Sequence, residues 1–303
     1  MPRVELPAGG IDYQDTGGAG PVLVFTHGFP MNETQWRKVL PHLAGYRCIL
    51  PTLPLGGHRT PMHPDADLTQ RGLAHILADF LDALDLTGVT LVVNDWGGPQ
   101  FLVSEGRADR VARLVLVACE AFDNFPPPPA RPLVALSALP GGVWLMMKLL
   151  GTGFFRHSRK TFGCVSLRGV PDDVLDGWFA PATGSAAIRR DLRKFAAGTP
   201  EAPVLLEWTA QLARFDRPAL VVWAEQDAMM PREHGPRLAG LLPLGKLVEI
   251  ADSSTLIPED QPEELARVLV GFLADNGATP VLTRHCAGPA VTGGVRRLPG
   301  PRR

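Results

Sequence analysis

The spacing of hydrophobic residues along the chain predicts strands that alternate with helices. Apolar runs typical of buried strands occupy residues 21–26, 46–50, 89–93, 114–117, 219–223 and 246–250. Between the second and third runs, apolar residues recur at helical spacing over residues 73–84. We expect Asp67 to cap this helix, with Gln70 completing a capping box three residues later. The alternation predicts an α/β fold with a mostly parallel sheet flanked by helices.

The middle and the end of the chain depart from this alternation. Four consecutive prolines occupy residues 126–129, and the pattern from there to residue 214 is helical. We therefore expect a helical cap at 126–214, inserted into a core formed by residues 1–125 and 215–275. Residues 276–303 carry five arginines, no acidic residue and scattered Gly and Pro, which predicts a disordered basic tail.

Composition narrows the classes of partner. The chain has 303 residues, 45% of them hydrophobic, and a formal net charge of −1. This balance indicates neither a nucleic-acid partner nor a membrane partner, so we expect a small-molecule substrate. The longest apolar stretch, residues 133–147, is shorter than the roughly 20 residues of a membrane-spanning helix. No secretory signal, metal-binding cluster or phosphate-binding loop is recognisable, and we expect a cytoplasmic protein without metal or cofactor.

The third apolar run leads into the sequence Asn94-Asp95-Trp96-Gly97-Gly98, which a short helix is expected to follow. A strand that turns sharply into a helix places one side chain at the tip of the turn, and small residues must flank it. This pattern predicts a nucleophile elbow with Asp95 at its tip.

Four segments in the same order carry a family resemblance. They are HGFP at 27–30, NDWGG at 94–98, WAEQDAMMP at 223–231 and DSSTLIPEDQP at 252–262. Together they resemble the haloalkane dehalogenase and epoxide hydrolase branch of the α/β-hydrolases, over about residues 10–275. The resemblance implies an α/β-hydrolase fold with an inserted helical cap. It also implies a hydrolase that holds a small or medium apolar substrate between the core and the cap.

The resemblance assigns roles to individual residues. Asp95 corresponds to the nucleophile, and Asp227 to the acid that orients the catalytic base. The backbone N–H groups of Phe29 and Trp96 would stabilise negative charge beside Asp95. The indole N–H of Trp96 would hold a departing halide, although Trp96 is equally suited to forming a wall of the pocket. His27 would shape the loop beside the substrate pocket.

The candidate pocket residues of the predicted cap are tryptophans. Its tryptophans, Trp144, Trp178 and Trp208, are expected to line the substrate pocket and to be available to a leaving halide. Epoxide hydrolases of this branch protonate the substrate with tyrosines of the cap. The tyrosines of this chain are Tyr13 and Tyr46, both before the elbow. The comparison therefore favours dehalogenase chemistry over epoxide hydrolysis.

The catalytic base of the family has no counterpart. In the resembling families a histidine lies seven residues before the proline that corresponds to Pro262, and here that position is Thr255. No histidine lies between His234 and His285. Threonine cannot deprotonate water near neutral pH, so an ester formed on the nucleophile would resist hydrolysis. Among the other histidines, His58 is the one to consider as a substitute, although a surface position in its loop is expected.

Three hypotheses follow for the function. The first is a hydrolase-like enzyme whose aspartate chemistry is impaired or altered by the missing histidine. The second is a non-hydrolytic enzyme, such as an isomerase, lyase or cyclase of a secondary metabolite. The third is a ligand-binding protein without catalysis, which would need neither a strained elbow nor a buried acid.

Overall fold

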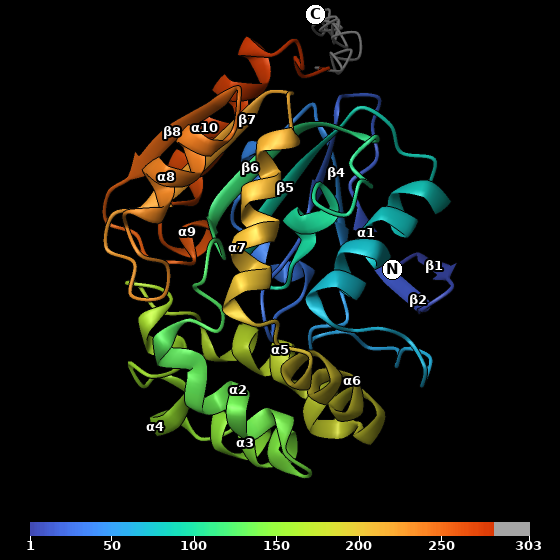
Figure 1. Cartoon of the computed structure of the whole chain (residues 1–303), viewed down its shortest axis with the longest axis vertical. Helices are drawn as coiled ribbons and strands as arrows, with labels where there is room; N and C mark the ends of the chain where they lie inside the picture. The colour runs from blue at the N-terminus through green and yellow to red at the C-terminus, as the bar shows by residue number, and fades with distance from the viewer. Residues whose placement is uncertain (282–303) are drawn as a thin grey trace, which may run out of the picture.

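A computed structural model describes residues 1–281 of the chain, which fold around one eight-stranded sheet (Figure 1). The strands are β1 (Arg3–Leu6), β2 (Gly9–Asp15), β3 (Val22–Phe25), β4 (Arg47–Pro51), β5 (Val89–Asp95), β6 (Val111–Cys119), β7 (Ala219–Ala224) and β8 (Gly245–Ile250). Their order in the sheet is β1-β2-β4-β3-β5-β6-β7-β8. All pairs from β4 to β8 are parallel, which confirms the predicted fold class.

The first two strands were not predicted. β1 and β2 form a hairpin, and β2 pairs antiparallel with β4. Their sequences, RVEL and GGIDYQD, mix polar with apolar residues. β1 is the edge strand and is largely exposed, whereas the first four residues of β2 are buried. In the sheet, β4 and β3 lie between this hairpin and β5.

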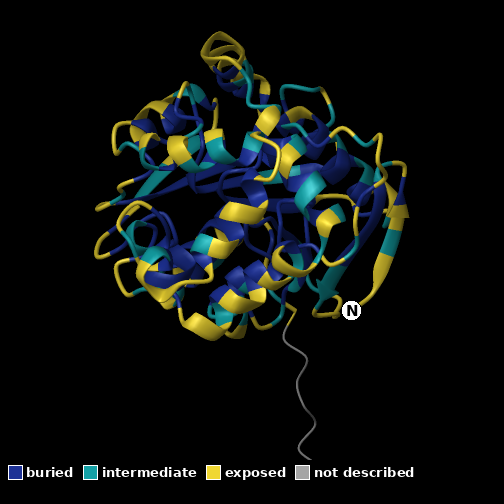
Figure 2. Cartoon of the chain, turned by 90° about the horizontal axis from the view of Figure 1, so that it is seen from below, coloured by how far each residue is buried: buried dark blue, intermediate teal, exposed yellow. Residues whose placement is uncertain are grey.

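Alternate residues of the central strands face two separate cores. Leu91 and Val93 of β5 join a core with α1 (Gln70–Ala83) and α8 (His234–Leu241). Val92 faces the opposite side and packs in a core with α10 (Pro262–Asp275). Because side chains alternate across a strand, the continuous apolar runs of the sequence cover both faces. Figure 2 shows the strands as buried layers beneath helices with exposed outer faces.

The start of α1 differs from the prediction. The N-cap is Thr69, whose hydroxyl accepts from the N–H of Gly72, and the helix begins at Gln70. Asp67, two residues before this N-cap, accepts instead from the N–H of Thr69. The side chain of Gln70 turns inward to Glu120, so no capping box forms.

Most helices between β6 and β7 gather at one end of the sheet, and we call this group of helices and their connecting segments the cap (Figure 1). They are α2 (Arg131–Ala138), α3 (Gly142–Leu150), α4 (Gly153–Arg156), α5 (Asp172–Gly184) and α6 (Ala186–Ala197). The next helix, α7 (Ala202–Gln211), runs alongside the sheet instead. Within residues 1–281, no helix combines the length and the apolar character needed to cross a bilayer.

The first residues of the expected tail are packed against the core. Ala278 is buried, and the N–H of Val281 donates to the carbonyl of Gly45 at 2.9 Å. The side chain of Arg113 holds the carbonyl oxygen of Asn276. The prediction of disorder is therefore wrong for residues 276–281, and residues 282–303 lie outside the described residues.

Candidate active site

The elbow at the end of β5 has the strained backbone that its sequence predicts. Asp95 adopts a φ of +65°, and Gly97 and Gly98 have φ values of +156° and +87°. A side chain at Gly98 would place its Cβ atom 2.7 Å from the carbonyl oxygen of Gln70. Glycine is therefore required both by the backbone conformation and by the contact with α1. The short helix expected next is a 3-10 helix at Pro99–Leu102.

The carboxyl group of Asp95 is buried between two backbone donors. Its Oδ2 atom accepts from the N–H of Phe29 at 3.2 Å, and the carboxyl also interacts with the N–H of Trp96. Burial nevertheless raises the pKa of Asp95 well above its ordinary value. A Cβ atom on Gly28 would lie 1.9 Å from Oδ2, so the loop approaches Asp95 this closely only with glycine.

Glu120 forms hydrogen bonds with the backbone of the elbow, a role that the sequence analysis did not predict. It follows β6 directly, is 2% exposed, and accepts from the N–H of Gly97 at 3.0 Å and from the N–H of Gly98. The side chain of Gln70 donates to its other oxygen at 2.6 Å. Burial raises the pKa of Glu120 to about 7. A carboxylate directly after an apolar strand run is the sequence signal that marks such a residue.

Asp227 and Thr255 form a direct pair. The hydroxyl of Thr255 donates to Oδ1 of Asp227 at 2.7 Å, and the same oxygen accepts from the N–H groups of Met229 and Met230. Burial raises the pKa of Asp227 to about 6. The other oxygen, Oδ2, is buried and has no hydrogen-bond partner among residues 1–281, and neither has Oδ1 of Asp95.

The loop that carries Thr255 is tied to the elbow and to the cap. The side chain of Asn94 donates to the carbonyl of Thr255 at 2.8 Å, next to Asp95. Asp260 is fully buried and accepts from the N–H of Ser254 at 2.9 Å and from the hydroxyl of Ser166 at 2.6 Å. These bonds fix the loop, the elbow and a cap segment in one arrangement.

A largely apolar cavity lies above Asp95. Its empty volume is about 480 Å³, including its open mouth. It is lined by Phe29, Pro30, Met31, Asp95, Trp96, Ala130, Leu133, Met146, Leu150, Lys160, Thr161, Phe162, Val165 and Met229. The ring of Phe29 packs on that of Trp96 with 4.7 Å between centroids, so this side of the cavity is aromatic. The arrangement suits an apolar molecule whose reacting atom faces Asp95.

None of the predicted pocket tryptophans of the cap lines this cavity. Trp144 is 51% exposed on the outer surface of the cap. Trp178 is buried, but its indole donates to the hydroxyl of Thr34 at 2.8 Å. Trp208 lies on α7 and packs against Phe101. Methionine, leucine and phenylalanine residues of the cap line the cavity instead, because the tryptophans support helix packing or face outward.

His27 also lies outside the cavity lining. Its ring is buried, Nε2 accepts from the N–H of Leu53 at 2.8 Å, and Nδ1 lies 3.0 Å from the carbonyl of Gly28. Burial lowers the pKa of His27 to about 4, so the ring is neutral. These bonds join its loop to the segment after β4. His27 is therefore not among the residues that line this cavity, and its ring holds the loop beside it.

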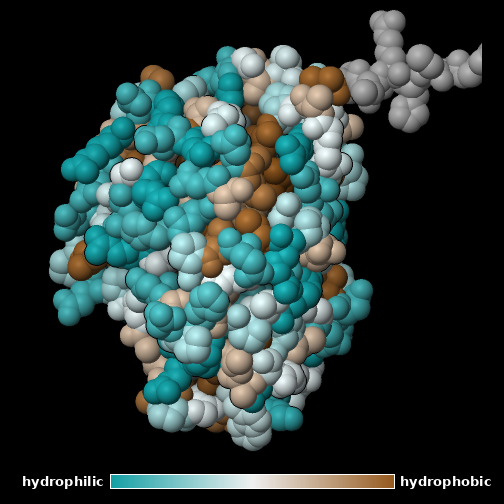
Figure 3. Space-filling model, turned by 90° about the vertical axis from the view of Figure 1, so that its right-hand side faces the viewer, coloured by the Kyte–Doolittle hydropathy of each residue, from teal (hydrophilic) through white to brown (hydrophobic). Residues whose placement is uncertain are grey.

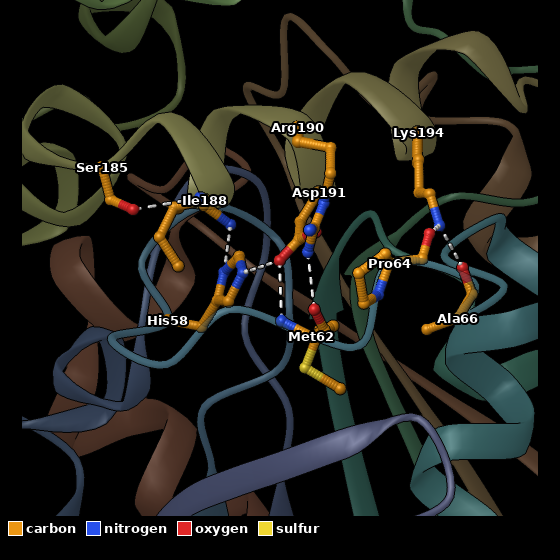
Figure 4. A network of polar contacts seen from close by, with 10 residues as sticks. His58, Met62, Pro64, Ala66, Ser185, Ile188, Arg190, Asp191 and Lys194 are labelled. Atoms are coloured by element: carbon orange, nitrogen blue, oxygen red, sulfur yellow. Dashed lines mark hydrogen bonds and ion pairs between the residues drawn. The ribbon is translucent and has the colours of Figure 1, made fainter.

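His58 is not a surface residue, and it does not line the cavity. It is 3% exposed, its Nδ1 accepts from the N–H of Gly56, and its Nε2 lies 3.3 Å from the carboxylate of Asp191 on α6 (Figure 4). Asp191 also accepts from Arg190 and from the N–H of Met62. His58 therefore joins the core to the cap, and within residues 1–281 it forms no hydrogen bond with Asp95.

The chain belongs to the α/β-hydrolase-fold family, whose sequence model matches residues 21–262. Within the superfamily it falls in the dehalogenase-like branch. It is 27% identical to haloalkane dehalogenase 2 of Mycobacterium tuberculosis over 272 residues, which cover 86% of this chain and 91% of that protein. The haloalkane dehalogenase of Mesorhizobium japonicum is 33% identical over 178 residues, 56% of each chain.

Two further similar proteins are one with a different activity in its name and one with a solved structure. A non-heme chloroperoxidase of Kitasatospora aureofaciens is 30% identical, with 87% of this chain and 95% of that protein covered. Among solved structures, an ancestral haloalkane dehalogenase matches with a TM-score of 0.74 and 25% identity, over 92% of this chain and 100% of that chain. The protein is therefore a hydrolase-class enzyme of this fold that resembles haloalkane dehalogenases.

Proposed function

We propose that Asp95 is a nucleophile toward small or medium apolar substrates that carry a leaving group on carbon, haloalkanes above all. The observation that supports this most is the placement of the Asp95 carboxyl, at the floor of an apolar cavity and beside the N–H groups of Phe29 and Trp96. The two donors hold the carboxyl of Asp95 in place, and the aromatic wall suits the binding of an apolar group next to it.

In the proposed step, a carboxylate oxygen of Asp95 attacks the substrate carbon. A carbon–oxygen bond forms, the carbon–halogen bond breaks, and the halide leaves with the bonding electrons. The indole N–H of Trp96 is suited to bind the halide, because it is a donor only. Unlike the indoles of Trp36, Trp178 and Trp223, it donates to no other residue within 1–281.

Release of the ester is the step for which this site is poorly equipped. It requires a water molecule to attack the ester carbonyl while a base removes a proton. In the proposed site, Thr255 takes the place of that base, and its hydroxyl donates to Asp227. An imidazole would offer nitrogen atoms to both carboxylates, and here each carboxylate keeps one oxygen without a partner. We expect hydrolysis of the ester to be slow or absent.

A second candidate is non-hydrolytic catalysis with Asp95 as a general acid or base. The observation that favours it is the burial of Asp95, which raises its pKa toward the range useful for proton transfer. This reading removes the problem of an ester that cannot be released. It predicts products that contain no oxygen from isotopically labelled water.

The experiment is intact-mass analysis of the protein after incubation with a panel of haloalkanes, epoxides and activated esters. We expect the wild type to gain the mass of one alkyl group and to retain it. Asp95→Asn should show no adduct. Thr255→His should release the alcohol and regain its original mass.

A matched control tests whether the effect of Thr255→His comes from the basicity of the new side chain or from its size. Thr255→Gln places a side chain of similar size at the same position but cannot take a proton near neutral pH. It should keep the adduct that Thr255→His releases. An adduct that persists in Asp95→Asn would assign the nucleophile elsewhere, and turnover of the panel without any covalent adduct would favour the second candidate.

A further inference from the structure

We propose that the outer face of the cap binds the surface of an anionic lipid bilayer. We call this surface the cap face and define it by Leu139, Trp144, Leu145 and Phe154 together with Lys148, Arg189 and Arg193. It lies on α3, α4, α6 and the end of α2, away from the sheet (Figure 1). The proposal does not depend on the chemistry of Asp95.

The cap face exposes large apolar side chains on neighbouring helices. Phe154 is 93% exposed, Leu139 58%, Trp144 51% and Leu145 42%. These residues lie on neighbouring helices, because α3 packs against α2, α4 and α6. Leu139 and Trp144 line one surface hollow together. Figure 3 shows scattered hydrophobic residues at the cap end of the molecule, while the broad hydrophobic stripe of this view lies over the core. Isolated exposed apolar residues are common, but a group that includes tryptophan and phenylalanine is typical of a membrane interface.

The charge of this part of the chain is mainly positive. The helices that carry the cap face lie within residues 131–197, which contain ten Lys and Arg residues and four Asp residues, although the whole chain has a formal net charge of −1. Three of the four acids pair with Arg156 or Arg190, which are not part of the cap face. The overall balance therefore concealed a local excess of positive charge. Lys148 lies over the ring of Trp144, with Nζ 5.9 Å from the ring centroid. A cation beside an exposed indole matches the boundary between lipid headgroups and acyl chains.

A hollow beside Trp144 has the chemistry of a phosphate site. It lies between α3 and α6, has an empty volume of about 410 Å³, and is lined by Leu139, Gly141, Val143, Trp144, Ala186, Arg189, Arg190 and Arg193. Arg189 donates to the carbonyls of Ala182 and Thr183, and Arg193 to that of Ala138. Neither arginine forms an ion pair with an acid of residues 1–281, so both retain charge for a headgroup phosphate.

The cap face and the active-site cavity share one helix. Met146 and Leu150 of α3 line the cavity, while Trp144 and Lys148 of the same helix face outward. A protein bound through this face would hold its cavity within one helix diameter of the lipid. An apolar substrate concentrated in the bilayer would then have a short path to the cavity.

A second copy of the chain is the less suitable occupant. A two-fold symmetric contact through the cap face would place Lys148, Arg189 and Arg193 opposite the same residues of the other copy. The residues that define the cap face include no acid that could offset this charge. An anionic lipid surface complements the same cations, and each contributes to binding near the membrane.

The test is co-sedimentation of the full chain with vesicles. We expect binding to vesicles of equimolar phosphatidylcholine and phosphatidylglycerol, and much weaker binding to phosphatidylcholine alone. Arg189→Gln with Arg193→Gln should lower the partition coefficient by about fivefold for each lost cation. Trp144→Ser with Phe154→Ser should remove the part of the binding that persists when added salt screens the charges.

Leu244→Ser is the matched control, because Leu244 is 54% exposed but lies on the core before β8. It should bind vesicles as the wild type does, and circular dichroism should show all variants folded. Equal binding to both kinds of vesicle, or unchanged binding by the cap-face variants, would overturn the proposal. The proposal would also be overturned if the wild type does not bind vesicles but forms a dimer, and if Trp144→Ser dissociates that dimer. This result would identify a second copy as the occupant of the cap face.

Discussion

Replacing Glu120 by glutamine should change how the stability of the protein depends on pH. The carboxyl of Glu120 is buried under the elbow with a pKa of about 7, against an ordinary value of 4.5. Between these two values the folded protein keeps a proton that the unfolded chain has released. Because the folded state then binds more protons, the free energy of unfolding falls as the pH rises from 4.5 through 7.

The size of this effect follows from the pKa difference. A tenfold change in proton affinity corresponds to about 1.4 kcal/mol, so full ionisation of Glu120 costs the folded protein about 3 kcal/mol. The glutamine variant has no such cost. Its amide oxygen can still accept from the N–H groups of Gly97 and Gly98. Its NH2 group can donate to Oε1 of Gln70, which has no partner in residues 1–281, if the Gln70 amide turns over.

The assay is urea unfolding, followed by circular dichroism, at a series of pH values between about 4 and 8. Relative to the wild type, Glu120→Gln should gain about 3 kcal/mol of stability from the lowest to the highest pH, with an unchanged slope against urea. Glu207→Gln, at an exposed position of α7, should show no such gain. A stability difference between Glu120→Gln and wild type that stays constant across the series would show that Glu120 has the same pKa in the folded and unfolded chain.

Three further outcomes are expected. Gly28→Ala should abolish adduct formation while the protein stays folded, because its Cβ would meet Asp95 Oδ2 at 1.9 Å; intact mass and circular dichroism test this, and a normal adduct would contradict it. The rate of adduct formation should rise with pH above the ordinary aspartate range, because the raised pKa of Asp95 keeps it protonated at lower pH; a flat profile between about pH 5 and 8 would count against this. Asp191→Asn should lower the free energy of unfolding by about 1–3 kcal/mol, because it weakens the buried bonds to His58 and Arg190, whereas Asp173→Asn on the exposed side of α5 should have little effect in the same urea assay.

The sheet and the elbow could be predicted because each leaves a strong local signal. Buried parallel strands are continuous apolar runs, and the tight turn after β5 demands glycine at Gly97 and Gly98. The N-terminal hairpin could not be predicted, because neither of its strands has a continuous apolar run. The N-cap residue of α1 is Thr69, two residues after the predicted Asp67. Both residue types are good N-caps, so only the packing decides between them.

The residues that line the cavity could not be predicted from the sequence, for a different reason. A helical pattern shows which residues are apolar, but it does not show whether an apolar residue faces the cavity, another helix or solvent. Trp144, Trp178 and Trp208 have these different surroundings, and none lines the cavity. The burial of His58 depends on Asp191, more than 100 residues later in the chain. The support of the elbow by Glu120 likewise requires three-dimensional contacts.

The attachment of the cap has a consequence for the entry of substrate. Asp260 holds the cap segment at Ser166–Arg168 to the loop of Thr255, and Asp191 holds α6 to the loop after β4. Opening the cap as a hinged lid would break the hydrogen bonds of both buried carboxylates together. We therefore expect substrate to reach Asp95 between side chains at the cavity mouth, through rotamer changes that are faster than domain opening.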